Sequence, residues 1–164
     1  MNTTRDVAGG APRDPAGDTT RDATGSPRLP EGYHLLPEPP SSDEYVRMRR
    51  EAGLSPRTPE QAVGALENSW TWASVRDGRG DLAGMGRVIG DGTWYFHIAD
   101  VATDPAHQRR GIGRAVMEHL IDRIDQAAPP QPYITLMADP PGQRLYRSLG
   151  FVDSAPTLGM RLPR

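Results

Sequence analysis

The sequence contains no cysteine, which excludes disulfides, thiolate ligands for a metal and any acyl-cysteine intermediate. Lysine is also absent, so all 19 basic residues are arginine. The formal net charge is only −2, which gives no electrostatic basis for binding nucleic acid or a membrane surface. No apolar run is long enough to span a membrane, and the N-terminus lacks the basic and then apolar order of a signal peptide. These absences favour a cytoplasmic protein whose chemistry involves no covalent cysteine intermediate.

Residues 1–30 have almost no large apolar side chains and consist mainly of Thr, Arg, Asp, Gly, Pro and Ala. Nothing in this stretch offsets the entropy that a chain loses when it is ordered. We therefore expect a disordered, low-complexity leader over residues 1–30. Residues 31–164 suffice for one domain with its own core, and a division into two domains would be forced.

The hydrophobic periodicity and the turn signals after residue 30 predict an α/β domain of the α+β type. Capping signals at Ser41 with Glu44 and at Thr58 with Gln61 open two short helices. Three strands joined by glycine-rich turns follow as an antiparallel meander, before a third helix begins at Ile112. The expected strands cover residues 33–36, 70–76, 82–89, 94–101 and 133–138, with a closing hairpin from 151–152 and 158–162, and the expected helices cover residues 41–52, 58–67, 112–128 and 143–149. We expect a mixed, mostly antiparallel twisted sheet of six to seven strands with about four helices on its two faces.

Two glycines stand at the junction between a strand and the third helix. Gly111 and Gly113 follow the strand that ends near Val101 and flank the helix start at Ile112. Glycines there leave the backbone N–H groups of the first turn open to a close approach, and the helix dipole adds partial positive charge. Full positive charges come from Arg109, Arg110 and Arg114. The combination predicts a phosphate or pyrophosphate site.

The stretch from Gln108 to Gly113 fits the pattern Gln/Arg-x-x-Gly-x-Gly/Ala, and Leu145 to Phe151 reads Leu-Tyr-Arg-Ser-Leu-Gly-Phe. These two motifs, in this order and at this separation, resemble those of the GNAT superfamily of acyl-CoA-dependent N-acetyltransferases. The resemblance covers roughly residues 32–162 and implies acetyl-CoA as co-substrate, without a metal. It also implies that the first motif holds the CoA pyrophosphate. Tyr146 of the second motif would lie near the CoA sulfur and protonate the leaving thiolate, with packing between helix and sheet as its alternative role.

By the same resemblance, the strand before the pyrophosphate loop carries a bulge and splays from its central parallel neighbour, and pantetheine fills the opening. Backbone groups of Val101 and Thr103 would bond the pantetheine amides. The Val101 N–H would stabilise the negative charge that develops on the thioester oxygen. The residues expected to bind the coenzyme are Val101, Ala102, Thr103, Gln108, Arg109, Arg110, Gly111, Ile112, Gly113 and Arg114.

An amine acceptor must lose a proton before it attacks, and two residues could take that proton. His97 occupies the strand position at which several superfamily members carry a Glu or His base, and period-two alternation puts it on the face of Val101. Asp100 points to the opposite face unless the bulge rotates it, and its ionised form would be a weaker base and a better anchor for a cationic substrate. The third interpretation is structural: His97 is a satisfied strand histidine, and Asp100 pairs with an arginine such as Arg87.

The acceptor pocket carries no recognisable code in the sequence. In the superfamily, the two helices between the first and second strands form part of this pocket. The candidates for its wall are Tyr45, Met48, Arg49 and Leu54, and core packing is the alternative for each of them. Many members also have Asn at the end of the strand before the last helix, where this chain has Asp139, so no contact is inferred for that residue.

Several other functions fit part of the pattern. A dinucleotide-binding fold needs a third glycine where Val116 stands, and a P-loop needs a Gly-Lys-Ser/Thr sequence that this chain lacks. A GNAT-fold sensor or partner-binding module that binds acyl-CoA without turnover remains an alternative. An enzyme that acetylates protein lysines or N-termini is another, but we favour a small-molecule amine because the sequence indicates no acidic groove for a basic tail. A homodimer is expected only by analogy with the superfamily.

Overall fold

The computed structural model describes residues 21, 25 and 27–162. The disordered leader expected over residues 1–30 falls almost wholly outside these residues, so it stays a prediction. Among the leader residues that are described, Arg21 donates two hydrogen bonds to the carboxylate of Asp122 at 2.7 and 2.9 Å, and Leu29 packs against the core. The end of the leader therefore already contacts the domain.

Five strands of the described chain form one sheet, in the order β1-β2-β3-β4-β5. The strands from β1 to β4 pair antiparallel with their neighbours, and β4 pairs parallel with β5. The strands are β1 (His34–Leu36), β2 (Thr71–Arg76), β3 (Leu82–Gly90), β4 (Tyr95–Thr103) and β5 (Tyr133–Leu136). A mostly antiparallel sheet with a parallel pair confirms the predicted fold class.

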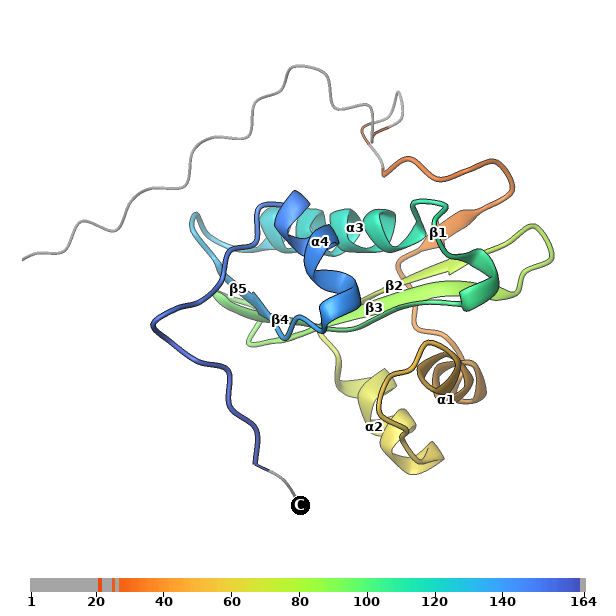
Figure 1. The fold of residues 1–164 in the computed structure, drawn as a ribbon, viewed down its shortest axis with the longest axis horizontal. Coiled ribbons are helices and arrows are strands. Elements are labelled where there is room, and N and C mark those ends of the chain that lie inside the picture. Colours follow the sequence, from red (N-terminus) through yellow and green to blue (C-terminus); the bar gives the residue numbers. More distant parts are fainter. Residues whose placement is uncertain (1–20, 22–24, 26, 163–164) are drawn as a thin grey trace, which may run out of the picture.

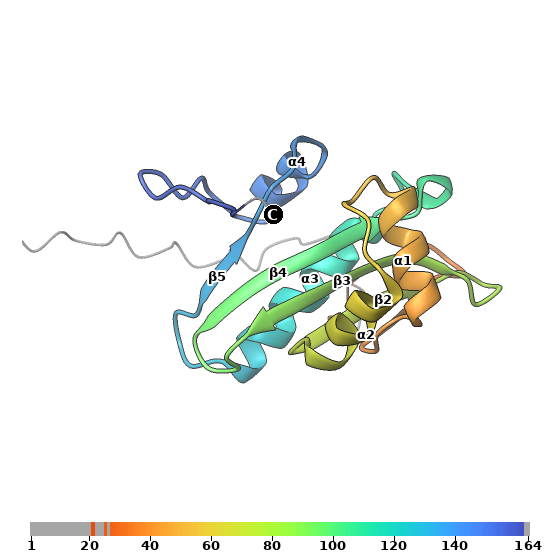
Figure 2. The same ribbon diagram turned by 90° about the horizontal axis from the view of Figure 1, so that it is seen from below.

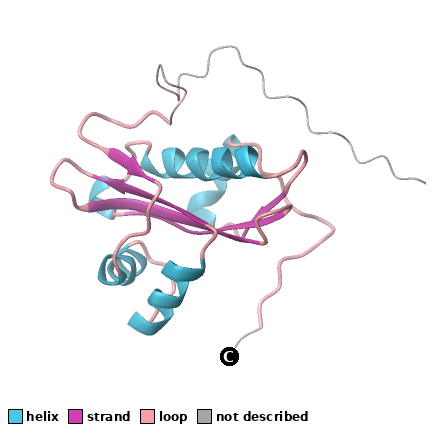
Figure 3. Cartoon of the chain, turned by 180° about the vertical axis from the view of Figure 1, so that it is seen from behind, coloured by secondary structure: helices cyan, strands magenta, loops and turns pink. Residues whose placement is uncertain are grey.

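The helices of the described chain cover both faces of this sheet, as Figures 1 and 3 show. One face carries α1 (Ser42–Glu51) and α2 (Pro59–Asn68), and the other carries α3 (Ile112–Ala127) and α4 (Pro140–Ser148). A short 3₁₀ turn, η1 (Pro105–His107), links β4 to the loop before α3. No helix among the described residues has the length and apolar character needed to cross a membrane.

Both predicted capping boxes are present, which confirms where α1 and α2 begin. The Ser41 hydroxyl accepts from the Glu44 N–H, and the Glu44 carboxylate accepts from the Ser41 N–H. Thr58 and Gln61 make the same reciprocal pair at the start of α2. Each box satisfies two backbone donors that a helix N-terminus would otherwise leave without a partner.

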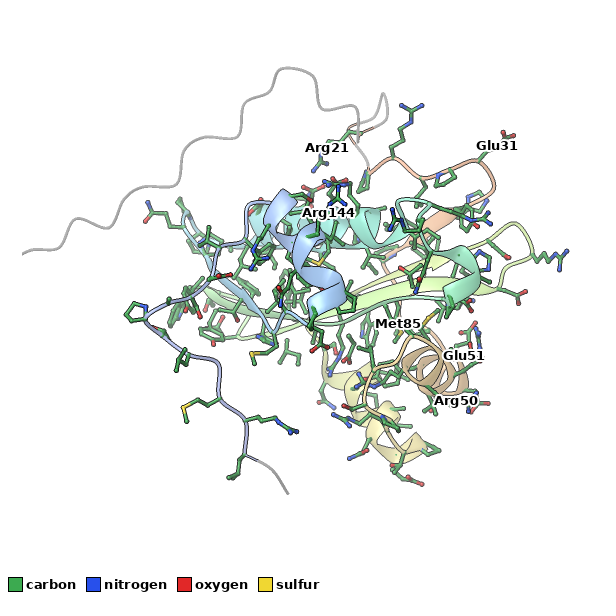
Figure 4. The ribbon with its side chains drawn as sticks, viewed as in Figure 1. Arg21, Glu31, Arg50, Glu51, Met85 and Arg144 are labelled. Carbon is green, nitrogen blue, oxygen red and sulfur yellow. The ribbon has the colours of Figure 1, made fainter. Side chains whose placement is uncertain are left out.

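The sheet separates two apolar clusters. The larger lies under α3, where a side chain on Gly86 of β3 would come within 2.7 Å of Val116, so the glycine lets helix and sheet approach closely. The smaller lies under α1 and α2 and contains Tyr45, Trp72 and Met85. Figure 4 labels Met85. Burial of both clusters explains why all four helices lie on the sheet.

Two predictions about the C-terminal part are wrong. The expected hairpin from 151–152 and 158–162 does not form, so the described sheet has five strands and not six or seven. Val152, Leu158, Met160 and Leu162 are 74% to 90% exposed, so pairing them would cover no core, and β5 offers only four residues to pair with. α4 begins at Pro140 and not near Gln143, because proline is well suited to a first helical turn whose N–H groups need no partner within the helix.

Candidate active site

The site forms around an irregularity in β4. Met85 of β3 lies opposite Ala102, but Arg87 lies opposite Ala99, so two residue steps in β3 match three in β4. The extra residue in β4 is a β-bulge, and Asp100 within it has a left-handed φ of 55°. The bulge expected before the pyrophosphate loop is therefore present.

The bulge decides which face of the sheet each neighbouring side chain occupies. Asp100 reaches Tyr45 and Arg49 of α1, so it lies on the face that carries α1 and α2. Val101 points to the other face, where it lies near Gly86 and beneath α3. The expectation that His97 shares a face with Val101 is wrong, because the extra residue rotates Asp100 onto the face of His97.

Asp100 lies at the centre of a largely buried ionic cluster. The Tyr45 hydroxyl and the Arg87 Nε each donate to its Oδ2 at 2.6 Å, and the Arg49 Nη1 donates to its Oδ1. Arg49 also donates to the carbonyl of Ser55 at 2.9 and 2.8 Å. Burial alone would raise the pKa of Asp100, but the hydrogen bond from Tyr45 and the charges of Arg87 and Arg49 hold this pKa below its usual value.

These contacts give Asp100 an anchoring role in the fold. A carboxylate with a lowered pKa and two guanidinium partners is a poor proton acceptor, and it has no charge left for a cationic substrate. Its pairing with Arg87 agrees with the structural interpretation of the sequence. Tyr45, Met48 and Arg49 are almost fully buried, so they pack inside the domain and do not form an open pocket wall.

His97 has a different environment on the same face. Its Nδ1 lies 3.0 Å from the Thr135 hydroxyl, which donates its proton to the carbonyl of Phe96 at 3.2 Å. The Nδ1 therefore carries the proton in this contact, and the lone pair of the neutral ring is on Nε2. Burial, followed by the charge of Arg87, lowers the pKa of His97, and the Asp100 carboxylate only partly opposes this. His97 is thus a neutral imidazole that can accept a proton at Nε2.

The parallel pair opens beyond the middle of β4. Pairing of β4 with β5 runs only from Tyr95 opposite Tyr133 to Ile98 opposite Leu136. β4 continues to Thr103, whereas the chain after β5 turns away, as Figure 2 shows. The part of β4 that contains Val101, Ala102 and Thr103 consequently has no strand on its β5 side within the described residues. This is the splayed arrangement that the resemblance implied.

The open edge of β4 leads to the N-terminus of α3. Gly111 precedes the helix with a left-handed φ of 83°, and no side chain caps the first turn. A Cβ on Gly111 would meet no atom within 4 Å, and one on Gly113 would make only ordinary contacts at 3.5 Å with Leu145 and Thr103. The first turn of α3 therefore presents backbone donors at a site where side chains do not block the approach of an anion.

The basic residues of the loop differ in how many hydrogen bonds they already make within the protein. Arg109 is exposed and has no hydrogen bond within the described chain, and Arg110 donates to the Tyr33 hydroxyl at 3.3 Å. Arg114 donates to Glu118 at 3.3 Å and to the Ser148 hydroxyl at 2.7 Å, so it links α3 to α4. Gln108 turns back to the carbonyl of Thr103, at 3.5 Å. Arg109 and Arg110 are thus better placed than Arg114 to meet a phosphate, and the binding roles of all these residues stay predictions.

A cavity of about 400 Å³ next to the loop does not suit a diphosphate. Three carboxylates, those of Glu44, Asp81 and Asp104, line it beside Arg47 and His107. The excess of negative charge would repel an anion, so the N-terminus of α3 is the better phosphate site. No group of three or more His, Asp or Glu residues in the described chain could hold a metal ion.

Tyr146 lies on α4, between that helix and the sheet. Its ring contacts Phe151 with the centroids 6.3 Å apart, and it lies directly against Gly142, where a Cβ would come within 2.6 Å of the ring. Burial, and to a smaller extent the Asp139 carboxylate, raise the pKa of Tyr146, so the hydroxyl keeps its proton at neutral pH. The structure is compatible with both roles expected for Tyr146, since a packed ring can also present a proton donor.

The sequence did not identify the partners of these residues. Thr135, which orients His97, lies 38 residues further along the chain, and the parallel register that joins them has no local signal. Gly142, which makes room for Tyr146, has no motif in the sequence that marks this role. Arg49 was a candidate for the wall of the acceptor pocket with core packing as the alternative, and the structure places it in the interior against the bulge.

The chain is similar in sequence to known acetyltransferases. The model of the acetyltransferase (GNAT) domain family matches residues 42–160. Histone acetyltransferase TAP1 of Glycine max is 36% identical over 107 residues, which are 58% of this chain and 46% of that protein. Serotonin N-acetyltransferase 2, chloroplastic, of Oryza sativa subsp. japonica is 35% identical over 102 residues, 60% of this chain and 50% of that protein. This chain thus spans about half the length of the curated relatives that it matches.

A solved structure gives a more complete match. A protein of unknown function from methicillin-resistant Staphylococcus aureus, described as a probable acetyltransferase, has a TM-score of 0.76 and 34% identity to this chain. The match covers 80% of this chain and 99% of the other. The similarity therefore extends over almost the whole of that fold, including the sheet and the helices on both faces.

The ionic cluster predicts a large and pH-dependent effect of Asp100→Asn. The substitution leaves two buried guanidinium groups without their anion, and we expect it to lower the free energy of unfolding by about 3 kcal/mol at pH 7. Because the folded pKa of Asp100 lies below its unfolded value of about 3.9, the stabilisation is complete above that pH and is lost as the pH falls through the folded pKa. Urea unfolding from pH 7 to pH 3 should show the difference from the wild type becoming smaller.

The matched control is Asp81→Asn, which removes an exposed carboxylate in the turn between β2 and β3 and should change stability by less than about 0.5 kcal/mol. Equal effects of the two variants at pH 7 would contradict the anchoring role of Asp100.

Proposed function

Since the chain belongs to the GNAT family of acetyltransferases, we propose that it transfers the acetyl group of acetyl-CoA directly to a primary amine of a small molecule in the cytoplasm. The observation that carries this proposal is the open edge of β4, which begins at the bulge and runs to the uncapped N-terminus of α3. A linear molecule with an acyl group at one end and a diphosphate further along fits such a track.

The residues present fit acetyl-CoA as co-substrate. The first turn of α3, with Arg109 and Arg110, would hold the diphosphate, because Gly111 and Gly113 leave its backbone donors accessible. Backbone groups of β4 between Val101 and Thr103 would pair with the pantetheine amides in place of a neighbouring strand. The coenzyme supplies an activated thioester, and the protein supplies its position.

His97 is the general base in this proposal. An amine with a pKa near 10 is mostly protonated at neutral pH and must lose a proton before it attacks. The Nε2 of His97 accepts that proton, directly or through water, while Thr135 holds the ring by its other nitrogen. Asp100 is not needed as a base, since its charge is used in the ionic cluster.

Two further groups complete the transfer. The N–H of Val101 donates to the thioester oxygen, where negative charge develops as the new C–N bond forms. The Tyr146 hydroxyl gives its proton to the sulfur as the C–S bond breaks. The ammonium group loses two protons in becoming an amide: His97 accepts the first before attack and passes it to solvent, and it accepts the second as the C–N bond forms. Tyr146 gives one proton to the thiolate and regains one from solvent, so one proton is released in total.

A second candidate is acetylation of a protein amine, because one of the relatives is named as a histone acetyltransferase. A third is binding of acyl-CoA without turnover. His97 is a neutral imidazole on the face of the sheet that carries α1 and α2. This favours turnover, because a sensor would not need a proton-accepting group there.

The coenzyme assignment predicts that loss of the loop arginines weakens acetyl-CoA binding. Changing both Arg109 and Arg110 to Ala should raise the dissociation constant about tenfold or more, because charge-assisted contacts to phosphate are lost. Isothermal titration calorimetry measures this directly. The control is Arg57→Ala with Arg79→Ala, which removes the same charge from two exposed loops elsewhere. If both double variants bind acetyl-CoA as the wild type does, the pyrophosphate is not at this loop.

Release of free thiol from acetyl-CoA in the presence of acceptors tests turnover. We expect release with at least one member of a panel of small primary amines, and slower or no release with lysine-containing and N-terminal peptides. Release only with the peptides would favour the protein-acetylating candidate. A protein that binds acetyl-CoA but releases no thiol with any amine or peptide would support the sensor.

The role of His97 predicts a change in the pH dependence of the rate. In the wild type, kcat/KM should fall as the pH falls through the pKa of His97, because the protonated ring cannot accept a proton. We expect His97→Gln to lower kcat/KM by about 100-fold and to remove this acidic limb. His34→Gln, an exposed histidine on β1, is the control and should keep the wild-type profile. An acidic limb that persists in His97→Gln would assign the base to another group.

A further inference from the structure

We propose that the acceptor is a small amine that carries a carboxylate, with an apolar α-amino acid as the simplest form, and that Arg87 binds the carboxylate beside His97. This inference rests on the proposed acetyl transfer and names the class of its acceptor. It derives from the side chains that share one face of the sheet around His97.

The strand register brings Arg87 next to His97. Arg87 lies opposite Ala99 across the β3–β4 pair, and His97 is two residues from Ala99 on the same strand. Residues two apart on a strand point to the same face, so Arg87 and His97 are diagonal neighbours, about 7–8 Å apart between backbones. Thr135 on β5 completes this row through its contact with His97.

The guanidinium group of Arg87 is only partly used by the protein. Its Nε donates to Asp100 at 2.6 Å and its Nη1 donates to the Ser69 hydroxyl at 3.0 Å. Its Nη2 makes no hydrogen bond within residues 21, 25 and 27–162, and its side chain keeps 16% of its surface exposed. A donor of this kind at the edge of a buried cluster is available to a ligand.

The charges on this face do not cancel. Arg49 and Arg87 carry two positive charges, and Asp100 carries one negative charge that both arginines share. The charged groups that act on His97 are Arg87 and Asp100, and Arg87 is the stronger of the two. The cluster of Arg49, Arg87 and Asp100 therefore has an excess of one positive charge beside the proposed base. It repels an ammonium group alone and attracts an amine whose carboxylate balances that charge.

Apolar side chains also border His97. Ile89 of β3 is directly opposite His97 and is 42% exposed, and Met137 follows β5 and is 62% exposed. The segment after α4 passes this edge, since a Cβ on Gly159 would come within 2.8 Å of the Met137 side chain. Figure 1 shows that segment running past β5 to the side of the sheet that carries α1 and α2. The surroundings of His97 thus offer both a cation and apolar side chains, as an apolar amino acid requires.

The test compares acceptors that differ only in the carboxylate. Leucine, methionine and phenylalanine are each assayed against their amides by thiol release from acetyl-CoA. An amino acid amide has more of its amine unprotonated at a given pH, so basicity favours the amide and a preference for the acid must come from its charge. We expect kcat/KM to be on the order of ten to a hundred times higher for the free acid.

Arg87→Met should reduce this ratio of acid to amide to about one, and Arg87→Lys should keep part of it. Because Arg87 also contacts Asp100, the Met variant could be less stable. The ratio within one preparation does not depend on how much of the protein is folded, so it still reports the loss of the carboxylate contact. Arg79→Met removes the same charge in the turn between β2 and β3 and should leave the ratio unchanged.

Binding is measured in parallel, as the shift in melting temperature of the protein saturated with CoA. Equal rates for acids and amides would overturn this inference and leave acetyl transfer intact. Stabilisation by the acids alone, lost in Arg87→Met and without thiol release from any amine, would uphold the carboxylate site and overturn the transfer. Neither release nor stabilisation would overturn both.

Discussion

The carboxylate of Asp100 is the constraint on which the rest of the structure depends. Taking a carboxylate and two guanidinium groups out of water is costly, and the cost is recovered only where the groups meet with good geometry. Asp100 can meet Arg49 of α1 and Arg87 of β3 only if β4 contains an extra residue that rotates it toward them. The ion pairs and the bulge therefore require each other, and together they fasten α1 to the centre of the sheet.

The bulge places His97 and Val101 on opposite faces of the sheet. Val101 turns toward α3, and the backbone after it continues without a neighbour on the β5 side toward Gly111. His97 stays on the opposite face, where burial, followed by the charge of Arg87, lowers its pKa. Under the proposed function, backbone geometry would position the coenzyme, whereas side-chain charge would position the acceptor.

The parts of the fold that depend on neighbouring residues could be predicted. The two capping boxes, the apolar stripe of α3 and the turns of the meander all have signals within a few residues of each other. The absence of the closing hairpin could not be predicted. Apolar residues such as Leu158 and Met160 have the pattern of a strand, but they form one only where a sheet edge and a core surface are available to them. The prediction that His97 and Val101 share a face was also wrong, because strict alternation of side chains fails wherever a strand contains a bulge.

The sequence by itself determined the order of elements, the glycine turn before α3 and the position of Tyr146, since each of these follows from local propensity or from a motif of adjacent residues. Only the tertiary structure decided that Asp100 is an anchor, that Thr135 orients His97 and that Arg87 lies beside that imidazole. The physical reason is that charge and hydrogen bonding act through space. The pKa of Asp100, for example, depends on Arg87 and Tyr45, which are 13 and 55 positions away in the chain. These residues become its neighbours only when the strands pair and α1 packs on them.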